Sequence, residues 1–245
     1  SGFNGVSLQV RYEADDRARL VPFLADLVDL GNGGSPTDEA FDHVLNEWEE
    51  RFQSIRAPLG LEQQRGLFGE LCVLRELVNS GTAHPVRTWR GPARSLHDFV
   101  ALDWHIEVKT STTNPGRLKI HPLEQLEPIS EKFYLVMVKI TTGEGQTLPG
   151  LIEELRGMVA GHEGEGEHME RMLAIEGYRD QDADRYDNAY TLDGFHVLEI
   201  TNETPVLHRI RIDPDIACIQ GLRWIMRTEA LSFLEVDDGF WSSLG

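Results

Sequence analysis

The stretch "FYLVMVKI" (133–140) constrains the fold more than any other part of the sequence, because it is almost continuously apolar. A strand with one solvated face alternates apolar and polar side chains, whereas a strand covered on both faces reads as a near-continuous apolar run. The run is far shorter than the roughly 18 apolar residues that indicate a membrane-spanning helix. We therefore predict a strand at the centre of a sheet, with packed layers on both sides.

Helical and strand-like patterns surround this run in an order typical of α/β or α+β proteins. Residues 61–81 carry apolar positions at helical spacing and end at Gly81. Gly66 and Gly69 lie inside this predicted helix, where each costs about 1 kcal/mol relative to alanine, so we expect another element to approach closely there. Further helices are predicted at 151–160 and 169–177, and strands at 86–89, 99–102, 105–110, 118–120, 195–201, 206–212 and 216–227.

The N-terminal part is predicted to add a strand at 6–12, where apolar and polar residues alternate, and helices at 17–30 and 35–55. We expect residues 1–60 to pack on a core formed by 61–145, and residues 146–245 to complete the same domain. The expected fold class is α/β, with a central mixed β-sheet flanked by helices.

Charge is distributed unevenly along the chain. The formal net charge is −18, which argues against a nucleic-acid footprint over the whole surface. Residues 51–142, however, hold 12 Lys and Arg against 9 Asp and Glu, so a local phosphate-binding face is compatible with the composition. Residues 143–193 hold 13 Asp and Glu against 4 Arg. We expect this acidic segment to repel DNA, to lie away from the Asp98–Lys109 face and to serve as a surface for a protein partner or as a solubilising flank.

The two cysteines, Cys72 and Cys218, lie in apolar patterns and are expected to be core thiols in a reducing compartment. The first ten residues lack the basic and apolar regions of a signal peptide. No stretch is long and apolar enough to predict a membrane span. Together these features favour a cytoplasmic protein.

The stretch "HDFVALDWHIEVKTS" (97–111) places charged residues among two predicted strands. Glu107 and Lys109 are two apart on a strand and point to the same face, and Asp98 can reach that face if the strands pair as a hairpin. Besides waters, Mg²⁺ needs only one or two carboxylates and a backbone carbonyl, and a lysine there could orient or deprotonate a metal-bound water. The alternative is an exposed strand face with an ion pair.

Neighbouring residues favour the metal site over the exposed ion pair. Glu70 lies on the helix with the internal glycines, where a face of small residues could bring its carboxylate near the sheet. Polar residues on either side of Asp98 are candidates for nucleic-acid contacts, although ordinary surface positions explain the arginines equally well. These candidates are Arg87, Arg90, Arg94, Ser111 and Gln125.

The order of Glu70 on a helix, then Asp98, then "EVK" (107–109) resembles the PD-(D/E)XK nuclease superfamily. More narrowly, "GLFGEL", "WRGP", "HDF" and "EVKTS" resemble a group of bacterial proteins known mainly as PD-(D/E)XK family members of undetermined function, often linked with restriction and phage-defence gene clusters. The similarity covers roughly residues 40–145. His97 stands where the superfamily often has proline.

The resemblance implies a restriction-endonuclease-like core and gives the matching residues their roles. Asp98 and Glu107 would bind Mg²⁺, for which Mn²⁺ can substitute, with the Val108 carbonyl as an extra ligand. Glu70 would support the metal site, and Lys109 would be catalytic. The implied function is Mg²⁺-dependent endonucleolytic cleavage of DNA, in restriction or phage defence. Two alternatives remain: a non-cleaving nuclease-fold module that binds nucleic acid or a partner protein, and a different metal-dependent hydrolase.

Other motifs predict less. His162 and His168 frame three glutamates in "HEGEGEH", but the glycines favour a mobile loop over a metal site. The stretch "DQDADRYDNAYT" (180–191) begins like a calcium loop, yet Arg185 stands where that loop requires glycine. No nucleotide-binding P-loop is present, so any ATP hydrolysis would come from a partner, such as an ATPase of a defence system. A homodimer that cuts both strands is compatible with the sequence.

Overall fold

The computed structural model describes residue 25 and residues 58–91, 95–112, 117–120, 123–129, 131–206, 224–227 and 231–244. The chain divides into two compact units, Ser1–Ala57 and Pro58–Gly245, and every element described here lies in the second unit. Apart from residue 25, which is helical, the strand and helices predicted for residues 6–55 lie outside the described residues.

The described elements are helices and strands that follow one another in mixed order. The helices are α3 (Leu61–Asn79), α4 (Pro85–Thr88), α5 (Leu148–Val159), α6 (Glu165–Glu176) and α7 (Asp238–Ser242), with short 3-10 turns η2 (Leu123–Leu126) and η3 (Asp180–Arg185). The strands are β1 (Phe99–Val100), β2 (Trp104–Ser111), β3 (Arg117–Ile120), β4 (Lys132–Thr147), β5 (Ala189–Glu199), β6 (Trp224–Arg227) and β7 (Leu234–Glu235).

The main sheet has five strands in the order β1-β2-β4-β5-β7. Strands β2 and β4 run parallel, while the β1–β2, β4–β5 and β5–β7 pairs are antiparallel, so the sheet is mixed as predicted. A second sheet pairs β3 with β6. Because the main sheet joins strands from 99–147 with strands from 189–235, the regions before and after residue 146 share one structural unit.

Strand β4 is buried on both faces, which confirms the prediction from its apolar run. Its side chains alternate between two buried clusters. Val136, Val138 and Ile140 belong to the first cluster. Phe133, Leu135 and Met137 belong to the second. The first cluster is covered by helices, and the second by η2 and the β3–β6 sheet, so β4 separates two hydrophobic layers.

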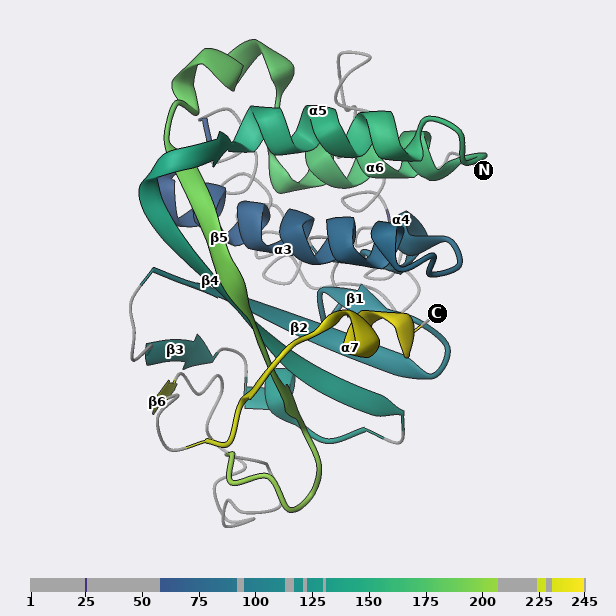
Figure 1. The fold of residues 1–245 in the computed structure, drawn as a ribbon, viewed down its shortest axis with the longest axis vertical. Coiled ribbons are helices and arrows are strands. Elements are labelled where there is room, and N and C mark those ends of the chain that lie inside the picture. Colours follow the sequence, from purple (N-terminus) through teal and green to yellow (C-terminus); the bar gives the residue numbers. More distant parts are fainter. Residues whose placement is uncertain are drawn as a thin grey trace, which may run out of the picture. The chain divides into compact units, whose positions relative to one another are not determined.

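The helices α3, α5 and α6 lie together on one side of the main sheet (Figure 1). Helix α3 contacts both β2 and α5, and it buries Leu67, Leu71 and Leu74 as its apolar spacing predicts. At its start, the Gly60 amide donates to Gln63 Oε1 at 2.9 Å. Such a bond satisfies one of the amides that a helix leaves open at its first turn.

The close approach predicted for the glycines of α3 occurs at Gly69. A Cβ atom on Gly69 would lie 1.9 Å from Thr110 Oγ1 on β2, so only glycine lets the helix pack this close to the strand. At Gly66 a Cβ atom would meet nothing within 4 Å, and the prediction is wrong at that position. Gly69 therefore fixes the distance between α3 and the strand that carries Glu107 and Lys109.

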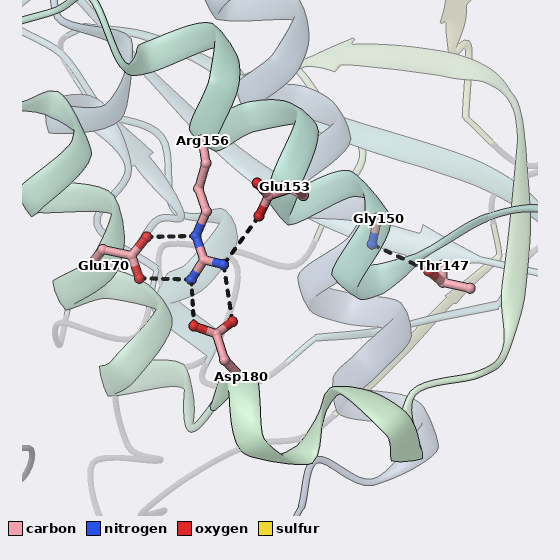
Figure 2. A network of polar contacts seen from close by, with 6 residues as sticks. All are labelled: Thr147, Gly150, Glu153, Arg156, Glu170 and Asp180. Carbon is pink, nitrogen blue, oxygen red and sulfur yellow. Dashed lines mark hydrogen bonds and ion pairs between the residues drawn. The ribbon is translucent and has the colours of Figure 1, made fainter.

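A polar network on the other side of the helical layer joins α5, α6 and η3 (Figure 2). Arg156 of α5 donates to both oxygens of Glu170 at 2.8 and 2.9 Å, and to both oxygens of Asp180 at 3.0 and 3.1 Å. These two carboxylates raise the pKa of the Arg156 guanidinium. Paired fork-like contacts have defined geometry, so the network holds the middle of α6, through Glu170, and the start of η3, through Asp180, against α5.

Two local predictions are wrong. Residues 86–89 were expected as a strand, but residues 85–88 form the short helix α4, because Pro85 opens a helical turn and the Glu165 carboxylate accepts the Val86 amide at 2.8 Å. Only Trp89 pairs as a strand residue, in an isolated bridge to Phe99. The second wrong prediction is the mobile acidic loop, because helix α6 already begins at Glu165.

The other predicted elements within the described residues are confirmed, with shifted ends: the strands at 99–102, 105–110, 118–120, 133–140 and 195–201 and the helices at 61–81, 151–160 and 169–177. Of the strand predicted at 216–227, residues 224–227 form β6, and residues 216–223 lie outside the described residues. Of the strand predicted at 206–212, all but residue 206 lies outside the described residues. Among the helices of the described residues, none is long and apolar enough to cross a membrane.

Candidate active site

Asp98 lies at the start of the predicted hairpin. Strand β1 pairs antiparallel with β2, with Phe99 opposite Ile106, which brings the residue before Phe99 alongside Glu107. The Asp98 carboxylate accepts the Val108 amide at 2.7 Å. Its own backbone carbonyl accepts the amides of Arg90 and Gly91 at 2.7 and 2.9 Å. Three backbone amides from two segments therefore fix both the main chain and the side chain of Asp98.

Glu107 and Lys109 project from β2 on the same side, as their spacing predicts. Lys109 Nζ lies 2.5 Å from Glu107 Oε1, and the Glu107 side chain is only 1% exposed. The second oxygen, Glu107 Oε2, is buried and has no hydrogen-bond partner among the described residues. The exposed ion pair considered from the sequence is therefore wrong, because the Glu107 side chain is buried. A buried carboxylate with an unsatisfied oxygen is costly unless something else binds it.

Glu70 joins these residues from α3. Its Oε2 accepts a hydrogen bond from the indole Nε1 of Trp89 at 2.8 Å. Trp89 is fully buried and directly precedes the two residues whose amides hold the Asp98 carbonyl. One short segment, Trp89–Gly91, thus positions both the helical acid and the strand acid.

The polar residues predicted to contact nucleic acid have different surroundings. Gln125 of η2 accepts a hydrogen bond from Lys109 Nζ at 3.1 Å, so it lies beside the predicted catalytic lysine. Ser111 is buried at the end of β2. Arg87 lies 3.2 Å from the buried Glu165 carboxylate, while Arg90 is exposed. Arg94 lies outside the described residues.

The sequence of the chain matches a protein family over residues 12–220, and the family is described as "Putative PD-(D/E)XK family member, (DUF4420)". This match covers well over half of the chain. The chain belongs to this family. Among curated proteins and solved structures, no match to the chain was found. The PD-(D/E)XK membership predicted from the sequence is thereby confirmed, and the mixed sheet flanked by helices agrees with a restriction-endonuclease-like core.

The three acidic residues predicted for the PD-(D/E)XK quartet lie in a poorly solvated place. Burial raises the pKa of Glu107 well above its usual value, and the charge of Asp98 raises it further, against the opposing effect of Lys109. Burial also raises the pKa of Asp98. The pKa of Glu70 is also raised, with burial as the largest cause and the charges of Asp98 and Glu176 as the next. Burial thus destabilises the charged form of all three carboxyl groups, and acidic neighbours add to this at Glu70 and Glu107.

Lys109 remains an ammonium ion in this setting. Burial is the largest single effect and would lower the pKa of Lys109, but the charge and hydrogen bond of Glu107, together with the charges of Asp98 and Glu70, outweigh it, so the pKa is raised. A lysine with a raised pKa donates hydrogen bonds and positive charge rather than accepting a proton. Of the two roles considered from the sequence, the electrostatic and orienting role therefore fits the structure better than the role of a base.

His97, which stands in place of the superfamily's proline, directly precedes Asp98 and is buried. Its Nδ1 lies 2.9 Å from His105 Nδ1, and its ring packs on Phe133 at a centroid distance of 4.2 Å. Burial lowers the pKa of His97 to about 4, and the neighbouring His105 contributes to this decrease. Two facing nitrogens at this distance require one donor and one acceptor, so at least one of the two imidazole rings is neutral.

The residues present fit a divalent cation in chemical type. PD-(D/E)XK nucleases generally use divalent metal ions, and carboxylate oxygens are the ligands that Mg²⁺ prefers. A nearby positive charge would stabilise the unpartnered Glu107 Oε2 and would reduce the repulsion between the carboxylates. No set of three or more His, Cys, Asp and Glu side chains within the described residues is closed around a metal position. Mg²⁺ keeps several waters, so one or two of these carboxylates suffice.

Sequence reasoning missed two residues of this site. Trp89 was part of the quoted "WRGP" motif, but nothing in the motif indicated an indole–carboxylate hydrogen bond. Glu176 lies at the end of α6, and burial together with the charge of Asp98 raises its pKa to about 7. Its spacing of three and seven residues from the buried Leu173 and Met169 was a usable signal, because it places a charged residue on the buried face of the helix.

The prediction that the acidic segment 143–193 lies away from the site is therefore wrong in part. Glu176 belongs to that segment, and its charge acts on Glu70 and Asp98. Glu165, another member, is 1% exposed and holds the start of α4 through the Val86 amide. The exposed members, such as Glu163 and Glu167, are still free to face solvent or a partner.

Proposed function

We propose that this protein is an Mg²⁺-dependent DNA endonuclease of the PD-(D/E)XK type that acts in restriction or phage defence. The observation that carries the proposal is the convergence of Glu70, Asp98, Glu107 and Lys109 around one buried, negatively charged place. An exposed strand face would not hold a carboxylate that is 1% exposed with an unsatisfied oxygen. The intact quartet also supports cleavage over the non-cleaving alternative.

Asp98 and Glu107 are the residues that would hold Mg²⁺ or Mn²⁺, with Glu70 beside them and the Val108 carbonyl as a further oxygen. A divalent cation there lowers the pKa of a water and offsets the charge that develops on a phosphate. The Val108 amide and the Arg90 and Gly91 amides keep Asp98 in one orientation. This preorganisation keeps the carboxylate in place without reorganisation during the reaction.

Lys109 supplies a positive charge next to Glu107, and Gln125 limits where its ammonium group can point. In this position the ammonium group is suited to donate to a phosphate oxygen or to orient the attacking water. Arg90 is exposed and precedes Asp98, so it is the most suitable of the described arginines for contact with the DNA backbone. Arg87 is a weaker candidate, because Glu165 already pairs with its charge.

The remaining proposals concern partners and location. The exposed part of the acidic segment 143–193 would bind a protein, with an ATPase of a defence system as one candidate, because its charge disfavours DNA. A homodimer would supply two sites for cutting both strands. A cytoplasmic location fits a protein that meets foreign DNA inside the cell.

The test is plasmid nicking with Mg²⁺ or Mn²⁺, using supercoiled DNA and a single-stranded RNA of similar length. Wild-type protein is expected to nick the plasmid. Asp98→Asn should lose both cation binding and cleavage, whereas Lys109→Ala should cut orders of magnitude more slowly while cation binding largely persists. Lys119→Ala is the matched control, because that lysine is 80% exposed. Wild-type protein that binds no divalent cation at millimolar concentration and cuts nothing would contradict the proposal.

A further inference from the structure

Lys139 of β4 lies on the same face of the main sheet as Lys109 of β2, and the two strands are neighbours (Figure 1). In the parallel β2–β4 pair, Ser111 is opposite Lys139. Ser111 and Lys109 are two apart on β2, so they point to one face. Neighbouring strands are about 4.8 Å apart and rise about 3.3 Å per residue, which places the two lysines roughly 8 Å apart on the sheet.

His196 of β5 holds the ammonium group of Lys139. Lys139 Nζ lies 3.2 Å from His196 Nε2, and because an ammonium group can only donate, the imidazole is the acceptor. Burial is the largest effect that lowers the pKa of His196, and the charge of Lys139 adds to it, against the charge of Glu235. The imidazole is therefore neutral at neutral pH, and it directs the lysine without offsetting its charge.

The acidic side chains near Lys139 in the sheet do not pair with it. Asp193 of β5 accepts a hydrogen bond from Thr141 Oγ1 at 2.8 Å. Glu235 is opposite His196 on β7 and is exposed. Across the described part of the chain, no carboxylate forms an ion pair with Lys139, which is half-buried. A partly desolvated charge without a counter-ion is unfavourable unless an anion is bound.

The sheet leaves room beside this lysine. Gly194 is opposite Lys139 in the β4–β5 register, and the register shifts directly after this pair. A Cβ atom on Gly194 would meet no described atom within 4 Å. The φ of Gly194 is +148°, in a region that residues with a side chain rarely adopt. The β-bulge thus keeps the position next to Lys139 and His196 free of a side chain, and bulges are frequent beside active sites.

We propose that Lys139, positioned by His196, binds the DNA phosphate that neighbours the cleaved one. The inference rests on the proposed function for DNA as the ligand, but it concerns two residues outside the quartet. The separation of roughly 8 Å between the lysines is comparable to the distance between neighbouring phosphates on one strand. In this arrangement Lys109 acts at the cleaved phosphate, and Lys139 fixes the position of the strand along the sheet.

The experiment measures the affinity for a short fluorescent DNA duplex, with a chelator present and over a series of salt concentrations. Lys139→Met should weaken binding roughly tenfold at about 0.1 M salt and reduce the slope of log affinity against log salt by about 0.9, because one phosphate contact is lost. Lys132→Met is the matched control, since Lys132 is an exposed residue of β4 whose odd spacing from Lys139 places it on the other face. It should change neither quantity.

Two variants of His196 test its positioning role. His196→Leu keeps every charge and removes the acceptor, so it should weaken duplex binding while the salt slope stays close to that of wild type. His196→Gln should restore the affinity, because its side-chain oxygen can accept from the ammonium group. An equal loss of affinity in both variants would show that His196 does not act through Lys139.

The outcomes separate the inference from the proposed function. Lys139→Met protein that binds the duplex as tightly as wild type, or that loses no more affinity than Lys132→Met, would overturn the inference. The proposed function would stand in that case if wild-type protein nicked the plasmid. Wild-type protein that binds the duplex through Lys139 but nicks nothing would contradict cleavage and leave the phosphate contact. Wild-type protein that neither binds the duplex nor nicks the plasmid would overturn both.

Discussion

The indole of Trp89 donates a hydrogen bond to the carboxylate of Glu70 at 2.8 Å, and this contact joins the segment before Asp98 to helix α3. Trp89 is fully buried and forms an isolated antiparallel β-bridge with Phe99 of the hairpin. The hydrogen bond lowers the pKa of Glu70, against the burial and the neighbouring charges that raise it. Trp89 therefore holds Glu70 in position and favours its charged form.

Trp89→Phe should lower the affinity for Mn²⁺ roughly tenfold, because it removes a hydrogen bond that orients a residue of the cation site. Trp104→Phe is a matched control, since its buried indole also donates at 2.8 Å, to the Leu244 carbonyl. Both variants should lose similar stability in urea unfolding, and only Trp89→Phe should lose cation affinity in calorimetry. Equal effects on affinity would mean that Trp89 is only a core residue.

Lys109→Ala should lower the free energy of unfolding of the metal-free protein by about 3 kcal/mol at pH 8, because it leaves the buried Glu107 without its partner. Lys119→Ala, which removes an exposed pair with Glu62 at 4.0 Å, should change it by under about 1 kcal/mol. The measurement is urea unfolding in the presence of a chelator.

The loss caused by Lys109→Ala should shrink as the pH falls. Burial and Asp98 raise the pKa of Glu107, and Lys109 opposes them; without the lysine, Glu107 takes up a proton at a higher pH. A neutral Glu107 no longer leaves an uncompensated charge in the core. A loss of stability that stays constant from pH 8 to pH 5 would contradict this explanation.

Gly69→Ala and Gly66→Ala should change stability in opposite directions, although both lie inside α3. At Gly69 the new methyl group would collide with Thr110 on β2, and such overpacking costs about 1–3 kcal/mol. At Gly66 nothing lies within 4 Å, so alanine should stabilise the helix by about 0.5–1 kcal/mol. Urea unfolding of both variants checks the pair, and two changes of the same sign would show that the helix–strand distance is not set at Gly69.

Cys72 should be unreactive in the folded protein, because burial raises the pKa of its thiol to about 12 from 9.0. A raised thiol pKa means that the folded state favours the neutral form. Its contribution to stability is fully present below pH 9 and is lost as the pH rises toward 12. In a Cys218→Ala background, a thiol reagent at pH 8 should label the protein only in denaturant. Rapid labelling of the native protein would contradict the buried position.

The sequence by itself predicted most of the described helices and strands, and it proposed Glu70, Asp98, Glu107 and Lys109 as the candidate quartet. The apolar run of β4 required two covered faces, and the two-residue spacing of Glu107 and Lys109 required a common face, because both follow from the period of a strand. The same local patterns failed at residues 86–89, where Pro85 and a carboxylate from residue 165 turn a strand-like stretch into helix α4. No local pattern shows a cap that comes from 79 residues away.

Only the tertiary structure decided the surroundings of the quartet. It placed Gln125 on Lys109, paired Arg87 with Glu165 and brought Glu176 beside Glu70 and Asp98. Each of these contacts joins segments that are distant in the sequence. Each contact therefore depends on the distances at which helices and strands pack, such as the distance between α3 and β2 that Gly69 sets. The periods of strands and helices determine which face of its element a residue occupies. Packing determines which of these faces meet, and the charge balance of this site depends on that packing.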